Sequence, residues 1–485
     1  MSVARLLLPF KVVLVDEAER ITAHAALPLI IETLRAILPN ATWRQLRKAL
    51  GYSDWKAVRR HVESIVALVV SGGEHLSDLD VLRGDAGLRA MLDFDLSSPT
   101  QAKDFLYRFH QSESGSSLTP DEDAVLSVKG TATIRPEGPG LSGLDCLVLK
   151  TLEAMQAMQP RSTATLDVDA TIIEAHKALA LRAYEGTVGY QPQMALWAEQ
   201  GVWVCDEFRD GNVPAAFRVK DFIIRAFGNL PETVTRRRLR GDSALYDEEA
   251  LSWMADHGKV DFVVTADMSA SLEAVVKAIP DGVWRPYRSL DPHSKDTEER
   301  EWAEVINFVP AWKRNNRPGA TPFRYIAVRV RTRQRDLFEE DDNQWRHFAV
   351  VTNMDWAGDR LLRWHREKQG TVEFRHGVVK NDLGGGVLPC GRFGANAAWW
   401  RLNVLAHNVL ELLKSQALPE GIANARPKTL RFQLFNLPGR VVRHARTWVL
   451  KLYRGFPLAE AFVEARRRIA EMAALLARPP KAAAA

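Results

Sequence analysis

Apolar side chains recur every three or four residues in the first part of the chain, a spacing that lines one side of an α-helix. Two such series are Leu27, Ile30, Ile31, Leu34, Ile37 and Leu38, and then Val58, Val62, Ile65, Val66 and Val69. We therefore expect residues 1–111 to form a helical N-terminal region. The cations of this region fit a DNA-reading bundle and an ordinary solvated surface equally well. They are Arg44, Arg47, Lys48, Arg59 and Arg60.

The next part of the chain predicts a linker followed by an α/β core. Residues 112–139 are rich in Ser, Gly, Pro and acids, so 112–160 is interpreted as a linker with a lead-in helix. From 165 to 173 the apolar period is two, and Asp167 and Asp169 occupy one face of the expected strand. Further strands are expected at 193–197, 202–207, 236–239 and 261–266, and a helix at 215–227. Residues 161–268 are thus the first part of the core.

Three acids in this core are candidates for chemistry. Two carboxylates on one buried strand repel each other unless a cation lies beside them, although an edge strand with a wetted polar face is the alternative. Asp242 follows the strand at 236–239, at the carboxyl end where open α/β sheets bind ligands. It can instead be a helix cap, a place that Ser243 or Asp247 can also fill.

Residues 269–345 break the α/β alternation and predict a mostly β insertion, with strands near 302–308 and 323–335. Arginines line one face of the second strand, namely Arg329, Arg331, Arg333 and Arg335. The pattern does not decide whether they follow a nucleic-acid backbone or pair with the acids at 339–342. The tryptophans of this stretch favour core packing over stacking on an unpaired base. They are Trp284, Trp302 and Trp312.

Residues 346–420 return to the core, with a strand at 347–353 and helices at 360–380 and beyond 396. On the first helix Glu373, Gly377 and Lys380 share one face, which suits a metal-bound phosphate. Taken alone, such a pair is ordinarily a solvated face. Residues 421–485 are strongly basic, so we expect a helical C-terminal region that contacts phosphates or another acidic surface.

Composition narrows the class of protein. With 485 residues, of which 46% are hydrophobic and 26% charged, the chain predicts a globular protein of several domains or with large insertions. No apolar run approaches the roughly 18 residues of a membrane-spanning helix, and no export signal is evident, so we expect a cytoplasmic protein. Three widely separated cysteines exclude a disulfide framework. A net charge of +5 favours a polyanionic partner.

Short motifs along nearly the whole chain resemble, in order and spacing, the DDE transposases of bacterial insertion sequences, specifically the insertion-sequence 1380 family. The motifs are Leu166-Asp167-Val168-Asp169-Ala170-Thr171, Arg240-Gly241-Asp242-Ser243, Gly370-Thr371-Val372-Glu373, Lys380-Asn381-Asp382-Leu383, Gly391-Arg392-Phe393-Gly394-Ala395-Asn396-Ala397, Lys428-Thr429-Leu430-Arg431-Phe432 and Leu437-Pro438-Gly439-Arg440. Any one of them is weak evidence, whereas the set is specific.

The resemblance implies an RNase H-like α/β core interrupted by the β insertion. It implies Asp169, Asp242 and Glu373 as the metal-binding triad, Lys380 as a fourth catalytic residue and Asp167 as a candidate additional ligand. The cofactor would be Mg²⁺, with Mn²⁺ able to substitute. The chain departs from the family's Tyr-Arg-Glu-Lys signature upstream of the glutamate, because Arg366 stands for the tyrosine and Gln369 for the arginine. Arg366 or Lys368 then has to supply the missing cation. DNA contacts are expected from Arg240, Arg329, Arg331, Arg333, Arg366, Lys368, Lys380, Arg392, Arg431 and Arg440.

The expected activity is that of a transposase. It binds terminal inverted repeats as double-stranded DNA, cuts the ends by a two-metal-ion mechanism and joins the 3′-hydroxyls to target DNA. A homodimer in a synaptic complex, associated with the bacterial nucleoid and not with a membrane, is implied. The alternatives are an RNase H-like nuclease without strand transfer and a domesticated, catalytically inactive DNA-binding protein.

Overall fold

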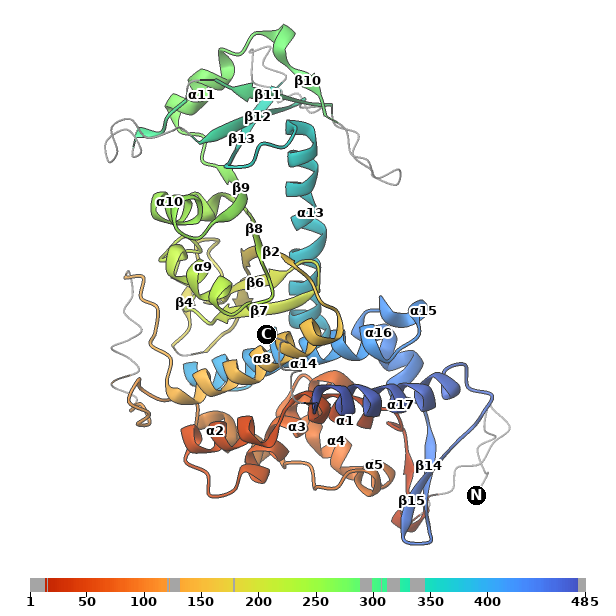
Figure 1. Ribbon diagram of the computed structural model, residues 1–485. Helices are drawn as coiled ribbons and strands as arrows, with labels where there is room; N and C mark the ends of the chain where they lie inside the picture. The colour runs from red at the N-terminus through yellow and green to blue at the C-terminus, as the bar shows by residue number, and fades with distance from the viewer. Residues whose placement is uncertain are drawn as a thin grey trace, which may run out of the picture.

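The computed structural model describes residues 14, 16–119, 122, 131–177, 179–287, 299–306, 308–311, 323–331 and 345–478. The molecule is elongated, with a sheet in its middle, a β-rich end and a largely helical end (Figure 1). The helical end contains α1 Pro28–Ile37, α2 Asn40–Leu50, α3 Trp55–Ser71, α4 Leu79–Gly84, α5 Ala86–Met91 and α6 Pro99–Tyr107. The two apolar series of the sequence fall on α1 and α3. In the described part of the chain, no helix is both long and apolar enough to cross a membrane.

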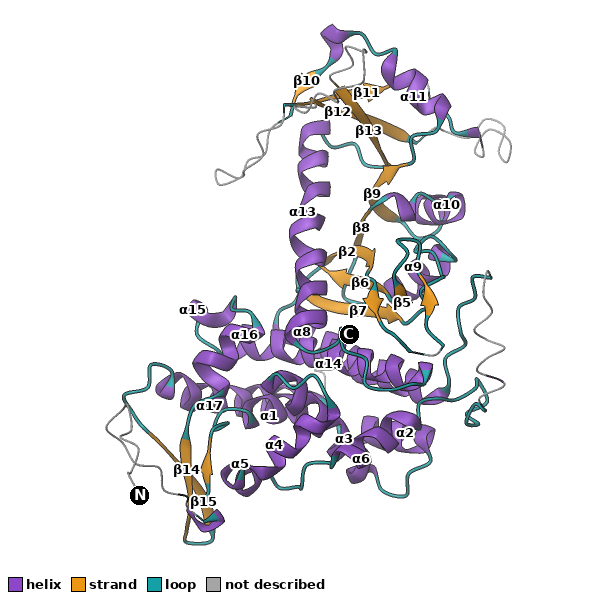
Figure 2. Cartoon of the chain, turned by 180° about the vertical axis from the view of Figure 1, so that it is seen from behind, coloured by secondary structure: helices purple, strands orange, loops and turns teal. Residues whose placement is uncertain are grey.

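Two long helices separate the N-terminal helices from the sheet (Figures 1 and 2). They are α8 Pro139–Met158 and α14 Phe393–Gln416. Because α14 is buried on almost every side, its polar residues need internal partners. Asn408 bonds both backbone groups of Trp203, and Arg401 pairs with Asp206 and Glu137. These contacts fasten the helix to one edge of the sheet.

The central sheet has nine strands in the order β10-β11-β12-β13-β9-β8-β2-β6-β7. Its core strands are β2 Thr163–Ala170, β6 Gln193–Trp197, β7 Val202–Glu207, β8 Arg236–Gly241 and β9 Val260–Ala266. Strands β2, β8 and β9 run parallel to one another. Strand β6 is antiparallel to its two neighbours, β2 and β7. Helices α9 Val219–Gly228 and α10 Glu248–Asp256 lie on one side of the sheet, and α13 Gly358–Gly377 lies on the other (Figures 1 and 2).

The expected β insertion proves to be continuous with this sheet. It contains α11 Ala270–Lys277, β10 Arg285–Pro286, β11 Arg300–Val305 and β12 Arg324–Arg331, and it leads into β13 Trp345–Thr352, the strand expected at 347–353, with which β12 pairs. Strand β13 pairs antiparallel with β9, so the insertion extends the sheet. A second hydrophobic cluster holds it against the start of α13, where Gly358 allows the Trp302 ring to approach closely. Trp284 and Trp302 are buried, which confirms core packing for both, and Trp312 lies outside the described residues.

Two smaller groups of elements complete the chain. A three-stranded sheet follows β2, formed by β3 Ile173–Glu174, β4 Leu181–Arg182 and β5 Val188–Tyr190. After α14 come α15 Glu420–Ala423, α16 Pro427–Leu430, a π-turn Arg431–Phe435, β14 Gly439–His444, β15 Thr447–Leu452 and α17 Ala459–Leu476. The expectation of a helical C-terminal region is therefore corrected in part, because residues 439–452 form a β-hairpin between the helical segments. Its strand signal is short, and the turn lacks the Asn-Gly or Asp-Gly pair that marks a hairpin.

Candidate active site

Asp169 and Asp242 come together because β2 and β8 are parallel neighbours. Asp167 is opposite Arg240 in the register of these strands. Asp169 and Asp242, each two positions later, therefore lie side by side at the carboxyl ends of the strands. Asp169 is near the end of β2, and Asp242 follows directly after β8. The sequence alone predicted both strands but not that they would be neighbours.

A lysine from α13 lies between these two acids. The Lys368 Nζ is 3.6 Å from Asp169 Oδ1 and 3.5 Å from Asp242 Oδ2, and only 10% of its side chain is exposed. His376, two turns later on the same helix, places its Nε2 3.8 Å from Asp169 Oδ2. Burial lowers the pKa of His376 to about 3, so its imidazole is neutral at ordinary pH and adds no second cation.

The electrostatics of this centre favour an additional positive charge. Burial raises the pKa of Asp169 to about 6; the ammonium of Lys368 opposes that rise, and the neighbouring carboxylate of Asp242 adds to it. The Asp242 side chain is 47% exposed and that of Asp169 is 18% exposed, so the pair opens to solvent on the Asp242 side. A positive charge placed at these oxygens relieves the repulsion between them.

Asp242 also has the capping role considered as its alternative. The Ala244 backbone N–H donates to Asp242 Oδ1 at 3.0 Å, while Oδ2 faces Lys368. Asp247 is the cap of α10, accepting from the Ala250 N–H at 2.8 Å. The capping bond fixes the Asp242 carboxylate through Oδ1 and leaves Oδ2 facing Lys368.

Asp167 has a different environment from Asp169, although both belong to β2. Its carboxylate is fully buried and receives two bonds from Arg240, Nε to Oδ1 at 2.6 Å and Nη2 to Oδ2 at 2.9 Å. The Thr371 hydroxyl donates to the same carboxylate, and Arg240 Nη1 reaches Glu367 Oε2 at 2.7 Å. These contacts correct two expectations. Asp167 has no open oxygen for a metal, and Arg240 is an internal counter-ion with 2% of its side chain exposed, so it is not a DNA contact.

The third acid of the expected triad stands apart. Glu373 is exposed on α13, between Thr371, which bonds Asp167, and His376, which faces Asp169. Among the described residues, no three His, Cys, Asp or Glu side chains form a group that could hold a metal ion. The structure thus brings Asp169 and Asp242 together and leaves Glu373 on the flank of the helix that covers them. Its role as a ligand stays a prediction.

Lys380 lies beyond the end of α13, in a short π-helical segment, Val378–Asp382. A continuous α-helix was expected there. Its Nζ donates to the Ile172 carbonyl at 2.6 Å, just past β2, and burial lowers its pKa. A cavity of about 710 Å³ adjoins this ammonium, lined also by Thr171, Tyr184 and Glu185. Lys380 is therefore close in space to the strand that carries Asp169, and its catalytic role stays a prediction.

The remaining expected DNA contacts divide into engaged and open cations. Arg329 pairs with Glu301 and Asp281, and Arg331 pairs with Glu299; these acids are not those at 339–342 that the sequence suggested. Arg333 and the acids at 339–342 lie outside the described residues.

The other arginines expected to contact DNA differ in how exposed they are. Arg431 Nε donates to the Val70 carbonyl at 2.8 Å and closes the end of α3, which gives it a structural role. Arg366 lies beside Tyr287 and is partly buried. Arg392 and Arg440 are exposed, the first over the ring of Tyr107 at 4.7 Å and the second paired with Glu19.

Sequence reasoning missed His376 and assigned Lys368 to DNA without placing it between the acids. A signal was present, because Lys368, Val372 and His376 recur at intervals of four and lie on one side of the helix. A buried lysine and histidine on the covering helix are typical of an internal charged centre.

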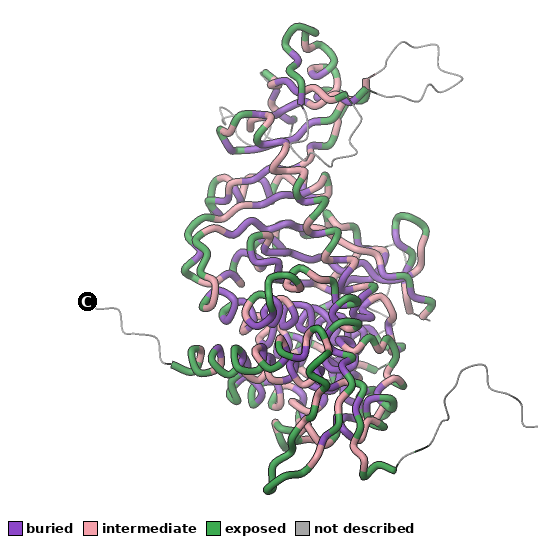
Figure 3. Tube along the Cα trace, turned by 90° about the vertical axis from the view of Figure 1, so that its right-hand side faces the viewer, coloured by how far each residue is buried: buried purple, intermediate pink, exposed green. Residues whose placement is uncertain are grey.

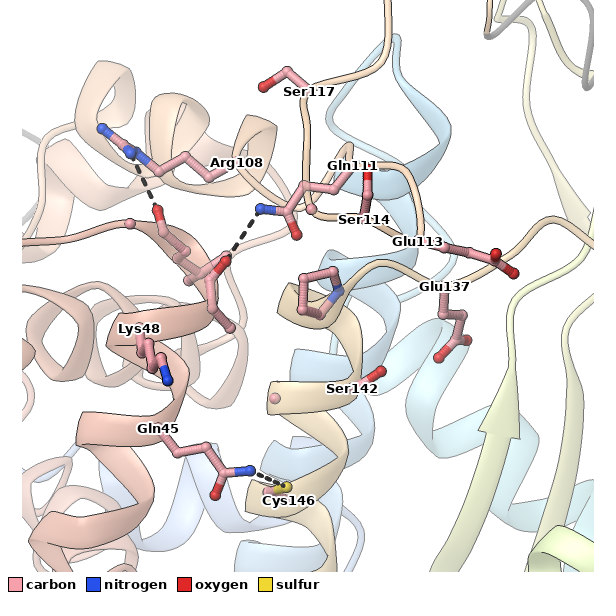
Figure 4. Close-up of a pocket in the computed structure, with 16 residues that line it drawn as sticks. Gln45, Lys48, Arg108, Gln111, Glu113, Ser114, Ser117, Glu137, Ser142 and Cys146 are labelled. Atoms are coloured by element: carbon pink, nitrogen blue, oxygen red, sulfur yellow. Dashed lines mark hydrogen bonds between the residues drawn. The ribbon is translucent and has the colours of Figure 1, made fainter.

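A second cavity, of about 940 Å³, lies between α2 and α8 (Figure 4). Gln45 bonds the Cys146 thiol across it, and Arg108 and Gln111 bond the last carbonyls of α2. Its wall combines Lys48 and Arg108 with two acids, Glu113 and Glu137. The contacts join the N-terminal helices to α8, and the cavity contains none of the residues of the acid pair.

Comparison with known proteins now bears on this centre. The family described as "Transposase DDE domain group 1" matches residues 42–474. The chain belongs to this family. A search of curated proteins finds no match. Among solved structures, the chain is similar to a piggyBac transposase synaptic complex with hairpin DNA, with a TM-score of 0.46 and 9% sequence identity over 84% of this chain and 78% of that chain.

The match to transposase DDE domain group 1 spans the strands that carry Asp169 and Asp242 and the helix that carries Lys368 and Glu373. The protein is a transposase, so the acid pair is the natural place to look for its chemistry. The general expectation drawn from the sequence motifs is confirmed at the level of this family.

Proposed function

We propose that this transposase cuts DNA at the ends of its element by metal-dependent hydrolysis and joins the freed 3′-hydroxyls to target DNA. The observation that supports it most is the pair Asp169 and Asp242 at adjacent ends of two parallel strands, with a cation between them. The strand order β9-β8-β2-β6-β7 supports an RNase H-like core, and the motif order supports the insertion-sequence 1380 family.

The residues at this centre fit a divalent metal. Their donors are carboxylate oxygens, the ligands that hard ions such as Mg²⁺ and Mn²⁺ prefer. The raised pKa of Asp169 and the ammonium of Lys368 placed between the acids indicate a strong local demand for positive charge. Asp169 and Asp242 would hold the metal, and Glu373 would reach it from the same helix as Lys368. We infer that Asp167 supports the site only indirectly, by fixing β2 against β8.

The proposed chemistry is the hydrolysis of a phosphodiester, followed by transfer of the freed end to target DNA. Mg²⁺ held by these oxygens would promote deprotonation of the attacking water, or of the attacking 3′-hydroxyl in the second reaction, and would offset charge on the leaving oxygen. Water attacks the phosphorus, the bond to the 3′ oxygen breaks, and a 3′-hydroxyl and a 5′-phosphate result. In the second reaction that 3′-hydroxyl attacks a target phosphodiester, forms a new ester and releases a target 3′ oxygen.

In this proposal the two lysines, Lys368 and Lys380, bind phosphate. Lys368 lies within reach of a phosphate held at the two acids, so its ammonium can offset charge that accumulates on the transferred group. It supplies the cation that Gln369 lacks relative to the family signature. Lys380, next to the carbonyl of Ile172, would hold the strand a step further along. Two ends must be joined, so we propose a homodimer that bridges them.

The experiment uses DNA from the borders of the gene. Inverted repeats found there are placed on a linear duplex and incubated with the protein and Mg²⁺ or Mn²⁺. We expect cleavage at the repeat ends and, with a plasmid present, joined products. Asp242→Asn should abolish both reactions and leave binding of the duplex largely intact. The matched control is Asp95→Asn, at an exposed acid of the N-terminal region, which should behave as the parent.

The products separate the possible failures. Metal-dependent cleavage without any joined plasmid would reduce the proposal to a nuclease. Binding with no cleavage in either metal would indicate an inactive DNA-binding protein. Cleavage by Asp242→Asn at the parent's rate would remove the acid pair from the mechanism.

A further inference from the structure

The hairpin formed by β14 and β15 projects from the helical end of the molecule (Figures 1 and 2). Its base is anchored, because β1 Ile21–Thr22 pairs with the start of β14 and Val441 is buried. From Arg443 to Val449 every residue is exposed, and the tip stands clear of the helices (Figure 3). Strand β15 forms the outer edge of this small sheet. A protruding two-stranded ribbon of this kind needs a reason to remain uncovered.

The charge of this segment is entirely of one sign. Residues 421–459 contain no Asp or Glu, and their cations are Arg426, Lys428, Arg431, Arg440, Arg443, Arg446, Lys451 and Arg454. Within the part of the chain that the structure describes, no carboxylate forms an ion pair with Arg443, Arg446, Lys451 or Arg454. Such a surface is complementary to a polyanion.

Strand β12 shows what a neutralised row of arginines looks like in the same molecule. There Arg324 binds Glu304, Arg329 binds Glu301, and Arg331 binds Glu299, all on or next to the paired strand β11. Strand β12 and the hairpin both carry a dense set of cations. In the hairpin, however, the described residues pair only Arg440 with an acid, Glu19, and the cations from Arg443 onward have none. The hairpin is therefore the stronger candidate for a phosphate-binding surface.

The turn of the hairpin points to the same use. Ala445 and Arg446 both have positive φ, 46° and 68°, and connect the paired residues His444 and Thr447. Both torsions match the two-residue turn that suits twisted strands, but Gly or Asn is the residue that normally adopts them. An arginine is thus held in a backbone conformation unfavourable to it, at the outermost point of the ribbon. Near the tip, Trp448 is 40% exposed and its ring lies under the guanidinium groups of Arg20 and Arg443, so cations flank the apolar surface.

We propose that the β14–β15 hairpin is a DNA-binding ribbon that enters the major groove of duplex DNA, with Arg443 and Arg446 at its tip. The proposal rests on the proposed transposase function and names the surface that holds the DNA away from the acid pair. A two-stranded ribbon fits the width of the major groove, where arginine can also bind guanine edges. Lys451 and Arg454, nearer the base, would contact the flanking phosphates.

The first test measures affinity for a mixed-sequence duplex, and for the repeat duplex, over a range of salt concentrations. Replacing Arg443 and Arg446 together by Ala should weaken binding about tenfold, and the slope of log K against log salt should fall by about 2. The matched control replaces Arg467 and Arg468 by Ala. These are exposed cations of α17 that pair with Glu464 and Glu471, so affinity should stay within about twofold of the parent.

A second variant separates lost binding from lost folding. Arg446→Gly removes the cation but relieves the positive φ, so the thermal midpoint should stay the same or rise while DNA affinity falls. Protection of guanine N7 from dimethyl sulfate reports the major groove, and this protection by the parent should weaken in Arg446→Gly. An Arg446→Gly protein that is equally or more stable yet binds less DNA cannot be explained by misfolding.

The outcomes decide the proposal independently of the transposase function. If affinity and salt slope are unchanged in both variants while the parent still cuts end DNA, the DNA-binding role of the hairpin is overturned and the proposed transposase function is retained. The hairpin proposal is also overturned if the variants change self-association in sedimentation without changing DNA affinity, because the ribbon would then bind a second copy of the chain. Failure of the parent to cut end DNA in any metal would instead count against the proposed function.

Discussion

Near the carboxyl ends of β2 and β8, acids stand at two levels only two residues apart, which we call the inner end and the outer end, and their environments are opposite. At the inner end Asp167 is fully buried and joined to Arg240 by two hydrogen bonds. At the outer end Asp169 and Asp242 share one ammonium, that of Lys368, at 3.5–3.6 Å, and open to solvent. The inner acid therefore has all the positive charge it needs, while the outer acids have less than one full partner each.

The difference shows how one strand can hold both a closed ion pair and an acid pair that is open to solvent. Removing one member of a buried ion pair leaves an uncompensated charge, so the inner end resists separation of β2 from β8. That resistance holds the outer acids near each other in spite of their repulsion. The inner end is where we expect mutations to act on stability, and the outer end is where we expect them to act on activity.

The largest expected effect is on cleavage by Asp169→Asn. The amide cannot replace a metal-binding carboxylate, and the loss of several kcal/mol of charge stabilisation lowers the rate by roughly a thousandfold or more. Urea unfolding should show no loss of stability, since the carboxylate it replaces is costly to bury. Gel-based cleavage of repeat duplexes measures the rate. A variant that cuts normally would remove the contrast between the two ends.

The next effect is on folding, through Arg240→Met at the inner end. The change leaves Asp167 buried without its cation and should cost about 3–5 kcal/mol in free energy of unfolding, measured in urea. Arg331→Met provides the comparison, because its pair with Glu299 is largely exposed and should be worth less than about 1 kcal/mol. Equal losses in the two variants would show that the inner pair has no special structural weight.

A smaller effect concerns pH. Because Asp169 has a pKa of about 6 and must lose its proton to bind metal, the affinity for Mn²⁺ should fall by about tenfold for each pH unit below 6. In metal-free protein the same group makes the fold less stable as pH rises from about 4 to 6, since only the folded state still holds that proton. Removing the ammonium with Lys368→Met should raise the pKa of Asp169 and move the binding profile to higher pH. Calorimetric titration over this pH range measures the shift, with the exposed Asp95→Asn as the control. An unchanged profile in Lys368→Met would contradict the prediction.

The smallest effect is expected from Thr371→Val. The hydroxyl donates to Asp167, which keeps its two bonds from Arg240, so the cost should be about 1 kcal/mol in urea unfolding. Cleavage should change little, as the outer acids are untouched. A large loss of activity with normal stability would instead link the inner end directly to catalysis.

Much of the local structure could be predicted from residue patterns. The strands at 193–197 and 202–207 are observed with the expected bounds, and the helix carrying Glu373 begins two residues before its expected start. Patterns of this kind depend on neighbours along the chain, so a short window contains the information. The C-terminal hairpin was missed because its short strands give a weak periodic signal, and its turn has Ala and Arg where Asn or Gly is usual.

The sequence by itself determined that acids stand on one face of β2, that another follows β8, and that a transposase family is involved. It did not determine which acid stays open to a cation, because Asp167 and Asp169 have the same local pattern. That choice was made by tertiary contacts across 73 residues to Arg240 and by the helix that brings Lys368 to the strand ends. Whether a carboxylate is neutralised or left open depends on the side chains that neighbouring strands and helices bring against it. No short stretch of sequence contains that information, because those side chains are distant in the chain.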